Sequence, residues 1–370
     1  MKIPISDLDL SDLERRYVAD AMASGWISFS GEFVRRAEEA FARWCGVEGC
    51  TLVSNGTAAL HAALAAHGVG PGDEVIVPGL TFVSPAQCVA RVGATPVFAD
   101  VEETSWCIDP GEISALVTPR TRGVIAVDVV GHPADYDRLE EVCDRHGLFL
   151  IEDAAEAHGS RYRGKRTGSF GGIATFSFFA NKTLATGEGG AVVSNDSRLL
   201  AKVKLLKNHG MSPDKPYWHE VVGDNWRATN LVAALLVAQI ERADELMAKR
   251  SAVSSRYTEA LRDVPCLEPR PCALWAEVVP WLVTFRILPG APLDRASLLA
   301  RLREAGIDAR PLWHPLVDLP PYSGEARRRG TLTPRSRAIL ERAFWLPTSS
   351  RMTFEQVDFV AAEVRKAMAV

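Results

Sequence analysis

A lysine in the middle of the chain stands between two apolar stretches. Residues 175–193 read TFSFFANKTLATGEGGAVV, so Lys182 follows an aromatic run and precedes a glycine-rich turn. One interpretation is a surface lysine whose stem lies on apolar neighbours while its amine reaches water. The other is a lysine held in a pocket, where a neutral amine can attack a carbonyl group. Lys182 is therefore the first candidate catalytic residue.

Polar residues that suit an anion occur near a predicted helix start. The stretch SNGTAAL combines a turn with the beginning of an alanine-rich helix, and it contains Gly56, Thr57 and Ala58. Free N–H groups at a helix start bind phosphate-like anions, although such residues also serve as ordinary helix caps. Ser177 precedes Lys182 closely enough for its hydroxyl to contact the same ligand.

Further candidates follow predicted strands. Asp153 ends the apolar run LFLIED, where a carboxylate can keep a ring nitrogen protonated; a helix cap is the alternative. Glu156 follows it and faces either the site or water. Phe82 comes after another strand and could stack on a flat ring, with core packing as the alternative. Each of these features alone has an ordinary structural explanation.

Taken together, the candidates describe one kind of ligand. An anion-binding helix start, a partner for a ring nitrogen, a stacking face and an amine are what pyridoxal 5′-phosphate (PLP) requires. The phosphate is anchored, the ring nitrogen stays protonated, and the lysine binds the aldehyde. The combination predicts a PLP site.

Alternating strand and helix patterns must position these residues. Helical spacing is seen over residues 11–23, 32–44 and 136–146, and apolar strands are predicted at 49–53, 73–80, 95–101, 123–130 and 148–154. This alternation of β-branched strands with helices predicts a parallel sheet with helices on both faces. In such sheets, ligands gather at the carboxyl ends of the strands.

From about Leu231 the pattern changes. One long helix is predicted over residues 231–261, followed by a proline-rich segment, the strand WLVTFRIL and the helices ASLLARLREAG and FEQVDFVAAEVRKAM. We expect a large PLP-binding α/β domain at residues 1–245 and a small C-terminal α+β domain at 246–370. The long helix bridges the two.

The motifs resemble those of a known family. FSFFANKTLATGEGGAVVSND, EDAAEAHGS and GDNWRATN are similar to stretches of the DegT/DnrJ/EryC1/StrS family of PLP-dependent sugar aminotransferases, and they look most like GDP-perosamine synthases and related enzymes. The resemblance runs from GWIS to LPTSS. It implies an α/β, fold-type-I PLP-dependent transferase, with a mostly parallel sheet sandwiched by helices in the large domain and a smaller α+β C-terminal domain.

The resemblance also implies roles by position. Lys182 matches the lysine that carries the cofactor aldehyde and moves a proton to and from the cofactor. Asp153 matches the acid at the ring nitrogen, Phe82 the stacking aromatic residue, and Glu156 a residue near the ring O3′. The phosphate cradle corresponds to Gly56, Thr57, Ala58 and Ser177, with Asn230 expected to reach the phosphate of a neighbouring subunit.

The substrate side is implied in the same way. The residues expected there are Trp26, Ser28, His209, Arg310, Trp313 and His314. Two positions depart from the family pattern, because Asp128 and Val317 each stand where many relatives carry His. Both are expected near the sugar, and neither alters the cofactor residues.

The implied reaction is a two-stage transamination. L-Glutamate leaves its amino group on the cofactor as pyridoxamine phosphate (PMP), and a keto sugar then accepts it. The expected acceptor is a nucleotide-linked (GDP or dTDP) keto-6-deoxyhexose of amino-sugar biosynthesis. An unactivated keto sugar or keto-cyclitol of an antibiotic pathway is an alternative, as is a non-catalytic sugar-binding or regulatory protein on the same fold.

Other enzyme classes are disfavoured. Family members that act as dehydratases carry His in place of the lysine, whereas Lys182 is present. A nicotinamide enzyme is disfavoured because GVGPGD lacks the GxGxxG spacing.

Composition narrows the partners. The 370 residues carry a net charge of −4, which gives no overall attraction to nucleic acid or acidic membranes. The seven cysteines form no CxxC pair and have no histidines at zinc spacing, which predicts no metal site and free thiols in a reducing cytoplasm. No apolar stretch is long enough to span a bilayer. The resemblance further implies a homodimer with shared active sites.

Overall fold

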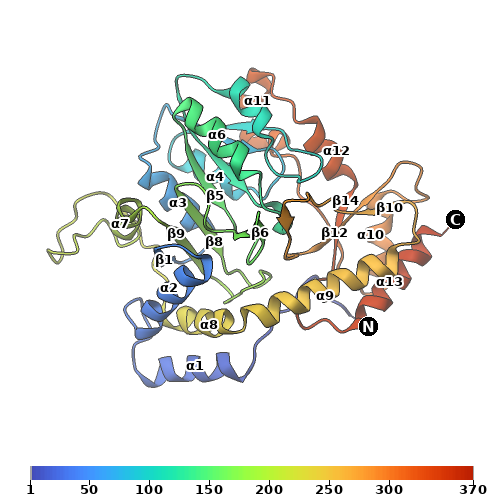
Figure 1. Cartoon of the computed structure of the whole chain (residues 1–370), viewed down its shortest axis with the longest axis horizontal. Coiled ribbons are helices and arrows are strands. Elements are labelled where there is room, and N and C mark those ends of the chain that lie inside the picture. Colours follow the sequence, from blue (N-terminus) through green and yellow to red (C-terminus); the bar gives the residue numbers. More distant parts are fainter. Residues whose placement is uncertain (1, 370) are drawn as a thin grey trace.

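A seven-stranded sheet forms the centre of the protein, which a computed structural model describes for residues 2–369 (Figure 1). The strand order is β1-β9-β8-β5-β4-β2-β3. Strand β9 runs antiparallel to both of its neighbours, and the other neighbouring pairs are parallel, so the predicted mostly parallel sheet is confirmed. The strands are β1 (Gly49–Val53), β2 (Glu74–Pro78), β3 (Thr95–Ala99), β4 (Thr121–Val127), β5 (Phe149–Asp153), β8 (Ile173–Ser177) and β9 (Gly190–Ser194).

Helices flank this sheet, and their ends follow the capping signals of the sequence. Ser11 and Glu14 form a reciprocal capping box at the start of α1, and Gly46 ends α2 in the left-handed conformation at φ 77°. The helices are α1 (Asp12–Ala23), α2 (Glu32–Cys45), α3 (Gly56–Ala66), α4 (Ser84–Arg91), α5 (Pro110–Leu116), α6 (Tyr136–His146) and α7 (Ser197–Leu206), with a 3₁₀ turn η1 (Val129–Gly131).

The predicted long helix is two helices. Helix α8 (Asn230–Glu241) and helix α9 (Ala243–Leu261) meet at Arg242, whose φ and ψ are −101° and 6°. The Arg242 guanidinium lies 3.0 Å from Asp9 and 2.8 Å from Glu14, and all three side chains are largely shielded from solvent. These buried ion pairs hold the junction to the N-terminal segment, and α9 continues away from the central sheet (Figure 1).

A second sheet lies beyond α9. Its four strands follow the order β10-β12-β14-β13, and they pack with α9, α10 and α13 into a separate hydrophobic cluster. The remaining elements are β10 (Leu267–Pro269), β12 (Val283–Ile287), β13 (Arg310–Pro311), β14 (Ala343–Leu346), α10 (Arg295–Glu304), η2 (Leu316–Asp318), α11 (Pro320–Arg329), α12 (Pro334–Arg342) and α13 (Phe354–Met368). A small third sheet joins β6 (Arg161–Tyr162), β7 (Lys165–Arg166) and β11 (Ala276–Glu277).

The hydrophobic cores cross the predicted division at residue 245 in both directions. Ile3, from the first residues, lies in the core of the second sheet. Conversely, Leu312, Tyr322 and Leu340, from the C-terminal part, pack into the core of the central sheet. The boundary between 1–245 and 246–370 therefore stays a prediction. Within residues 2–369, no helix combines the length and apolarity that a membrane crossing requires.

Candidate active site

A cavity of about 630 Å³ opens at the carboxyl ends of the central strands. It is lined both by the large sheet with its helices and by residues of the C-terminal part. The predicted residues that line it are Gly56, Thr57, Ala58, Phe82, Asp153, Glu156, Ser177, Lys182, Arg310 and Trp313. Ligand sites of open α/β sheets lie at this edge because the strand ends and helix starts converge there.

Lys182 is held inside this cavity. It lies in the turn after β8, where its N–H donates to the Phe179 carbonyl at 2.8 Å, and its side chain is only 11% exposed. The surface interpretation of this lysine is therefore wrong. Burial lowers the pKa of Lys182, while the carboxylates of Glu156 and Asp153 oppose that shift.

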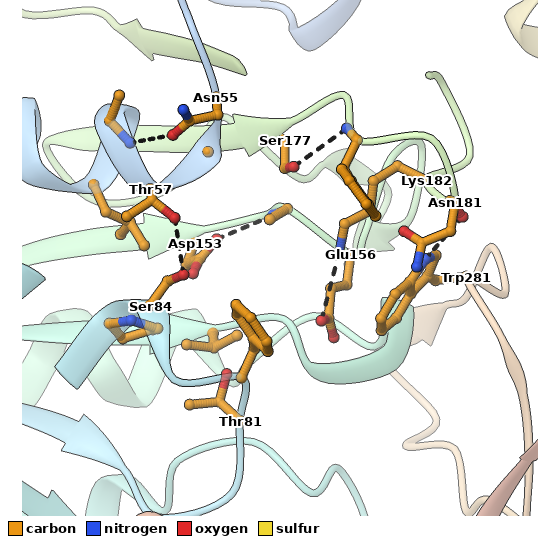
Figure 2. A pocket seen from close by; sticks show the side chains of 18 of the residues that line it. Asn55, Thr57, Thr81, Ser84, Asp153, Glu156, Ser177, Asn181, Lys182 and Trp281 are labelled. Atoms are coloured by element: carbon orange, nitrogen blue, oxygen red, sulfur yellow. Dashed lines mark hydrogen bonds and ion pairs between the residues drawn. The ribbon is translucent and has the colours of Figure 1, made fainter. Parts of the chain in front are cut away.

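Two side chains contact the lysine amine. Its Nζ lies 3.6 Å from Oε1 of Glu156 and 3.8 Å from the centre of the Trp281 ring. Figure 2 shows Lys182 and Glu156 pointing toward each other, with Trp281 beside them. The other oxygen of Glu156 accepts the N–H of Val130 at 2.9 Å. Burial raises the pKa of Glu156, and Lys182 opposes this rise.

Asp153 ends β5 at the base of the cavity. Its Oδ1 accepts the N–H of Ala155 at 3.2 Å, which is a turn contact, because no helix begins there. Burial raises the pKa of Asp153 to about 7, with Glu156 adding to the rise and Lys182 opposing it. A buried carboxyl with a raised pKa gains most from a cationic partner, such as a protonated ring nitrogen.

The start of α3 and the end of β8 form a narrow cradle. A Cβ added at Gly56 would lie 2.7 Å from the Cβ of Ser177, so only glycine leaves this space open. The hydroxyl of Thr57 contacts that of Ser84 at 3.0 Å. The N–H of Ala58 is already bound by the side chain of Asn55 at 2.8 Å, so Ala58 contributes shape rather than a free donor. The first N–H groups of α3 and the hydroxyls of Thr57 and Ser177 suit the binding of an anion.

An aromatic side chain covers another side of the cavity. Phe82 lines it and is 51% exposed, so plain core packing does not describe this residue. Together with the cradle and the lysine, Phe82 gives a space that fits a flat ring. The arrangement suits a ligand with an anionic group at one end and an electrophilic carbon at the other, which is how PLP is built.

Only part of the predicted substrate side reaches this cavity. Arg310 lines it, with its guanidinium paired to Asp308 at 2.8 Å, and Trp313 packs its ring against those of Trp281 and Trp345. The structure does not bring Trp26, Ser28, His209 and His314 into the cavity. All four are exposed and lie on loops outside it.

Asn230 also lies away from the cavity of its own chain. It is 1% exposed, its oxygen accepts the N–H of Phe33 at 2.9 Å, and its amide donates to the Trp26 carbonyl at 2.6 Å. These bonds fasten α8 to the start of α2. The expectation that Asn230 reaches the phosphate of a neighbouring subunit stays a prediction.

The two departures from the family pattern do not face the cavity. Asp128 is fully buried, and its Oδ1 accepts the hydroxyl of Tyr136 at 2.7 Å. Val317 is buried in the core of the central sheet. Both side chains point into the protein interior and neither lines the cavity, so the expectation that these residues lie near the sugar stays a prediction.

Several lining residues were missed by sequence reasoning. They are His61, Arg91, Asn181, Asp224, Trp226, Trp281 and Trp345. His61 lies one helical turn after Thr57, so the helical period could have indicated it. Asn181 directly precedes Lys182. Asp224 and Trp226 lie in the motif GDNWRATN, so all three stood in stretches that the sequence had already singled out. The remaining residues come from other segments and reach the cavity only through folding.

Comparisons with known proteins agree with this chemistry. Residues 9–365 match the DegT/DnrJ/EryC1/StrS aminotransferase family. The chain is 44% identical to GDP-perosamine synthase of Caulobacter vibrioides over 99% of this chain and 98% of that protein. It is 36% identical to dTDP-3-amino-3,4,6-trideoxy-alpha-D-glucose transaminase of Streptomyces venezuelae, over 99% and 96% of the two chains.

The solved structures agree as well. DesV of S. venezuelae, solved in complex with a ketimine intermediate, superposes with a TM-score of 0.93 at 35% identity, covering 100% of this chain and 99% of that one. A Streptococcus pneumoniae protein described as a "putative sugar aminotransferase" matches in both its PMP and PLP forms, each with a TM-score of 0.93 at 26% identity over 100% of this chain.

Proposed function

Because the chain belongs to the DegT/DnrJ/EryC1/StrS family of PLP-dependent aminotransferases, we propose that it moves an amino group from L-glutamate to a nucleotide-linked keto sugar, with Lys182 as the catalytic residue. The observation that carries this proposal is the buried Lys182 amine in one cavity with Asp153 and the open cradle at Gly56.

Different residues of the chain would bind different parts of PLP. The helix start at Gly56 and Thr57 and the Ser177 hydroxyl would hold its phosphate, Asp153 its ring nitrogen, and Phe82 one ring face. When bound, PLP supplies an aldehyde that accepts the amino group and a ring that withdraws electrons from the reacting carbon.

Lys182 has two tasks in this proposal. With PLP bound, its neutral amine would hold the aldehyde of the cofactor, and the same Nζ would accept a proton from the reacting carbon and return it during amino transfer. Both tasks need an unprotonated amine, and burial of Lys182 favours that form. Glu156, whose oxygen lies 3.6 Å from the amine, can accept the proton that the ammonium form would carry.

The acceptor is proposed to be a GDP- or dTDP-linked keto-6-deoxyhexose. The relatives' names support the nucleotide-linked class, and the cavity volume of about 630 Å³ lies in the range of small-molecule sites. Arg310, Trp313 and Trp345 line the cavity from the C-terminal part, where a sugar beyond the cofactor would lie.

A homodimer is part of the proposal. Large apolar side chains are exposed on two loops, after α1 and after α7, namely Trp26, Ile27, Phe29, Tyr217, Trp218, Val221 and Val222. Such exposure is unusual for a monomer and suits burial against a second copy. Sedimentation equilibrium should give twice the chain mass, and a monomer at micromolar concentration would contradict the dimer.

The proposed function is tested by absorbance of the purified protein with PLP. The wild type should show the visible band of lysine-bound PLP, and L-glutamate should convert it to the spectrum of PMP. Lys182→Ala should lose the band, while Lys204→Ala, at an exposed lysine on α7, should keep it. A panel of GDP- and dTDP-linked keto sugars should then restore the PLP spectrum. A wild type that forms no band would refute the proposal.

A further inference from the structure

A buried arginine lies directly behind the lysine-bearing turn. Arg250, on α9, is 2% exposed. Its Nη1 donates to the Trp281 carbonyl at 2.6 Å, and its Nη2 lies 3.4 Å and 3.3 Å from the carbonyls of Asn181 and Lys182. Three backbone carbonyls from two distant segments therefore meet at one guanidinium.

This arginine forms no ion pair of its own. Within residues 2–369, no carboxylate lies within salt-bridge distance of Arg250, and its Nε has no hydrogen-bond partner. Only the more distant carboxylate of Asp9, which is itself paired to Arg242 at 3.0 Å, favours the charged form of Arg250 against the effect of burial. Burying a guanidinium without a carboxylate is costly, and an apolar side chain could fill the same space. An apolar side chain would lack the several N–H donors and the positive charge of the guanidinium, so these two properties distinguish arginine at this position.

The Arg250 guanidinium connects the residues that surround Lys182. Trp281 also donates its ring Nε1–H to the Asn181 carbonyl at 3.0 Å, so Asn181 is fixed by both residues. The same Trp281 places its ring 3.8 Å from the Lys182 amine. Arg250 thus links three segments: α9, the segment before β12 and the turn after β8. Its contacts on that turn are the backbone carbonyls of Lys182 and of the residue before it.

The charge of Arg250 opposes the carboxylates around the amine. Glu156 and Asp153 favour the ammonium form of Lys182, as does the face of the Trp281 ring. His158 is buried and its pKa is lowered to about 3, so it adds no charge. Arg250, whose Nη2 lies 3.3 Å from the Lys182 carbonyl, acts in the other direction and lowers the pKa of Lys182, because a nearby positive charge disfavours a second one.

We propose that Arg250 is a positioning residue that fixes the turn carrying Lys182 through the carbonyls of Asn181 and Lys182 and whose positive charge favours the neutral form of the free lysine amine. A catalytic use of the Lys182 amine rests on the proposed function. The effect of Arg250 on the pKa of that amine does not, because this pKa can be measured in the protein without PLP.

The test is a pH titration of Lys182 in the cofactor-free protein. The rate of reductive methylation of Lys182 is followed by peptide mass spectrometry in wild type, Arg250→Met and Arg250→Lys. Arg250→Met removes the charge and should raise the apparent pKa of Lys182 above the wild-type value. Arg250→Lys keeps the charge and should leave that pKa near the wild-type value. An unchanged pKa in a folded Arg250→Met would overturn the proposal.

A second measurement keeps the proposal testable if Arg250→Met does not fold. Arg250→Lys has one nitrogen for three carbonyls, so amide hydrogen exchange in residues 182–186 should become faster while the pKa of Lys182 stays in place. Unchanged exchange, or a raised pKa, in this variant would overturn the proposal. Failure of the proposed function is recognised separately, because wild type would then form no PLP band whatever the Arg250 variants show.

Discussion

The amine of Lys182 and the carboxylate of Glu156 form a buried pair, with Nζ 3.6 Å from Oε1. Burial lowers the pKa of the lysine and raises that of the glutamate, and each charge opposes the shift of the other. The neighbours of the Lys182 amine therefore shift its pKa in both directions, and substitutions of different neighbours should raise or lower that pKa.

Glu156→Gln should lower the pKa of Lys182 in the cofactor-free protein by about one unit, because the carboxylate that stabilises the ammonium form is removed. The pH dependence of the reductive methylation of Lys182, followed by peptide mass spectrometry, measures this pKa. Glu341→Gln, at an exposed glutamate of α12, should leave the pKa unchanged. A shift upward in Glu156→Gln would contradict the assigned electrostatics.

Gly56→Ala should weaken PLP binding by about tenfold or more, because the new methyl group would lie 2.7 Å from the Cβ of Ser177 and fill the anion cradle. Fluorescence titration with PLP gives the dissociation constant. Gly70→Ala is the matched control, since a Cβ there meets nothing within 4 Å. Equal losses in the two variants would argue against the cradle.

Asp153→Asn should bind PLP yet slow the half-reaction with L-glutamate by about 10²-fold, because a neutral amide stabilises a protonated ring nitrogen far less than a carboxylate does. Single-turnover absorbance at the PLP band measures this step. Asp144→Asn, at an exposed position on α6, should retain the wild-type rate. A wild-type rate in Asp153→Asn would contradict the proposed role of Asp153 at the ring nitrogen.

Asp128→Asn should stabilise the protein at pH 8. Asp128 and Glu152 are both buried, and Oδ2 of Asp128 has no hydrogen-bond partner among residues 2–369. Burial raises the pKa of Asp128 to about 7 and that of Glu152 well above its usual range. Because the folded state holds a proton that the unfolded state releases near pH 4, wild-type stability should fall as pH rises from about 4 to 7.

The asparagine can keep the oxygen that accepts from Tyr136, so this variant should lose the part of the pH dependence that Asp128 contributes. The buried carboxyls of Glu152 and Asp153, whose pKa values are also raised, should retain theirs. Thermal melting at pH 5 and pH 8 gives the comparison, and Asp144→Asn again serves as the control. A wild-type melting temperature that does not fall between the two pH values would refute the buried-proton account.

Local sequence patterns determined much of the architecture. Capping at Ser11 and Gly46 and the apolar strands of the central sheet could be predicted, because these features depend on neighbouring residues and on regular spacing. The break at Arg242 could not, since it depends on ion pairs with Asp9 and Glu14, more than two hundred positions away.

The site divides in the same way. The sequence by itself determined that Lys182, Asp153, Gly56 and Ser177 belong together, because each lies at the end of a strand or the start of a helix, and parallel strands bring such ends to one edge. Only the tertiary structure decided that Trp281 and Arg250 enclose the lysine, because side chains from distant segments meet through packing that no local pattern encodes.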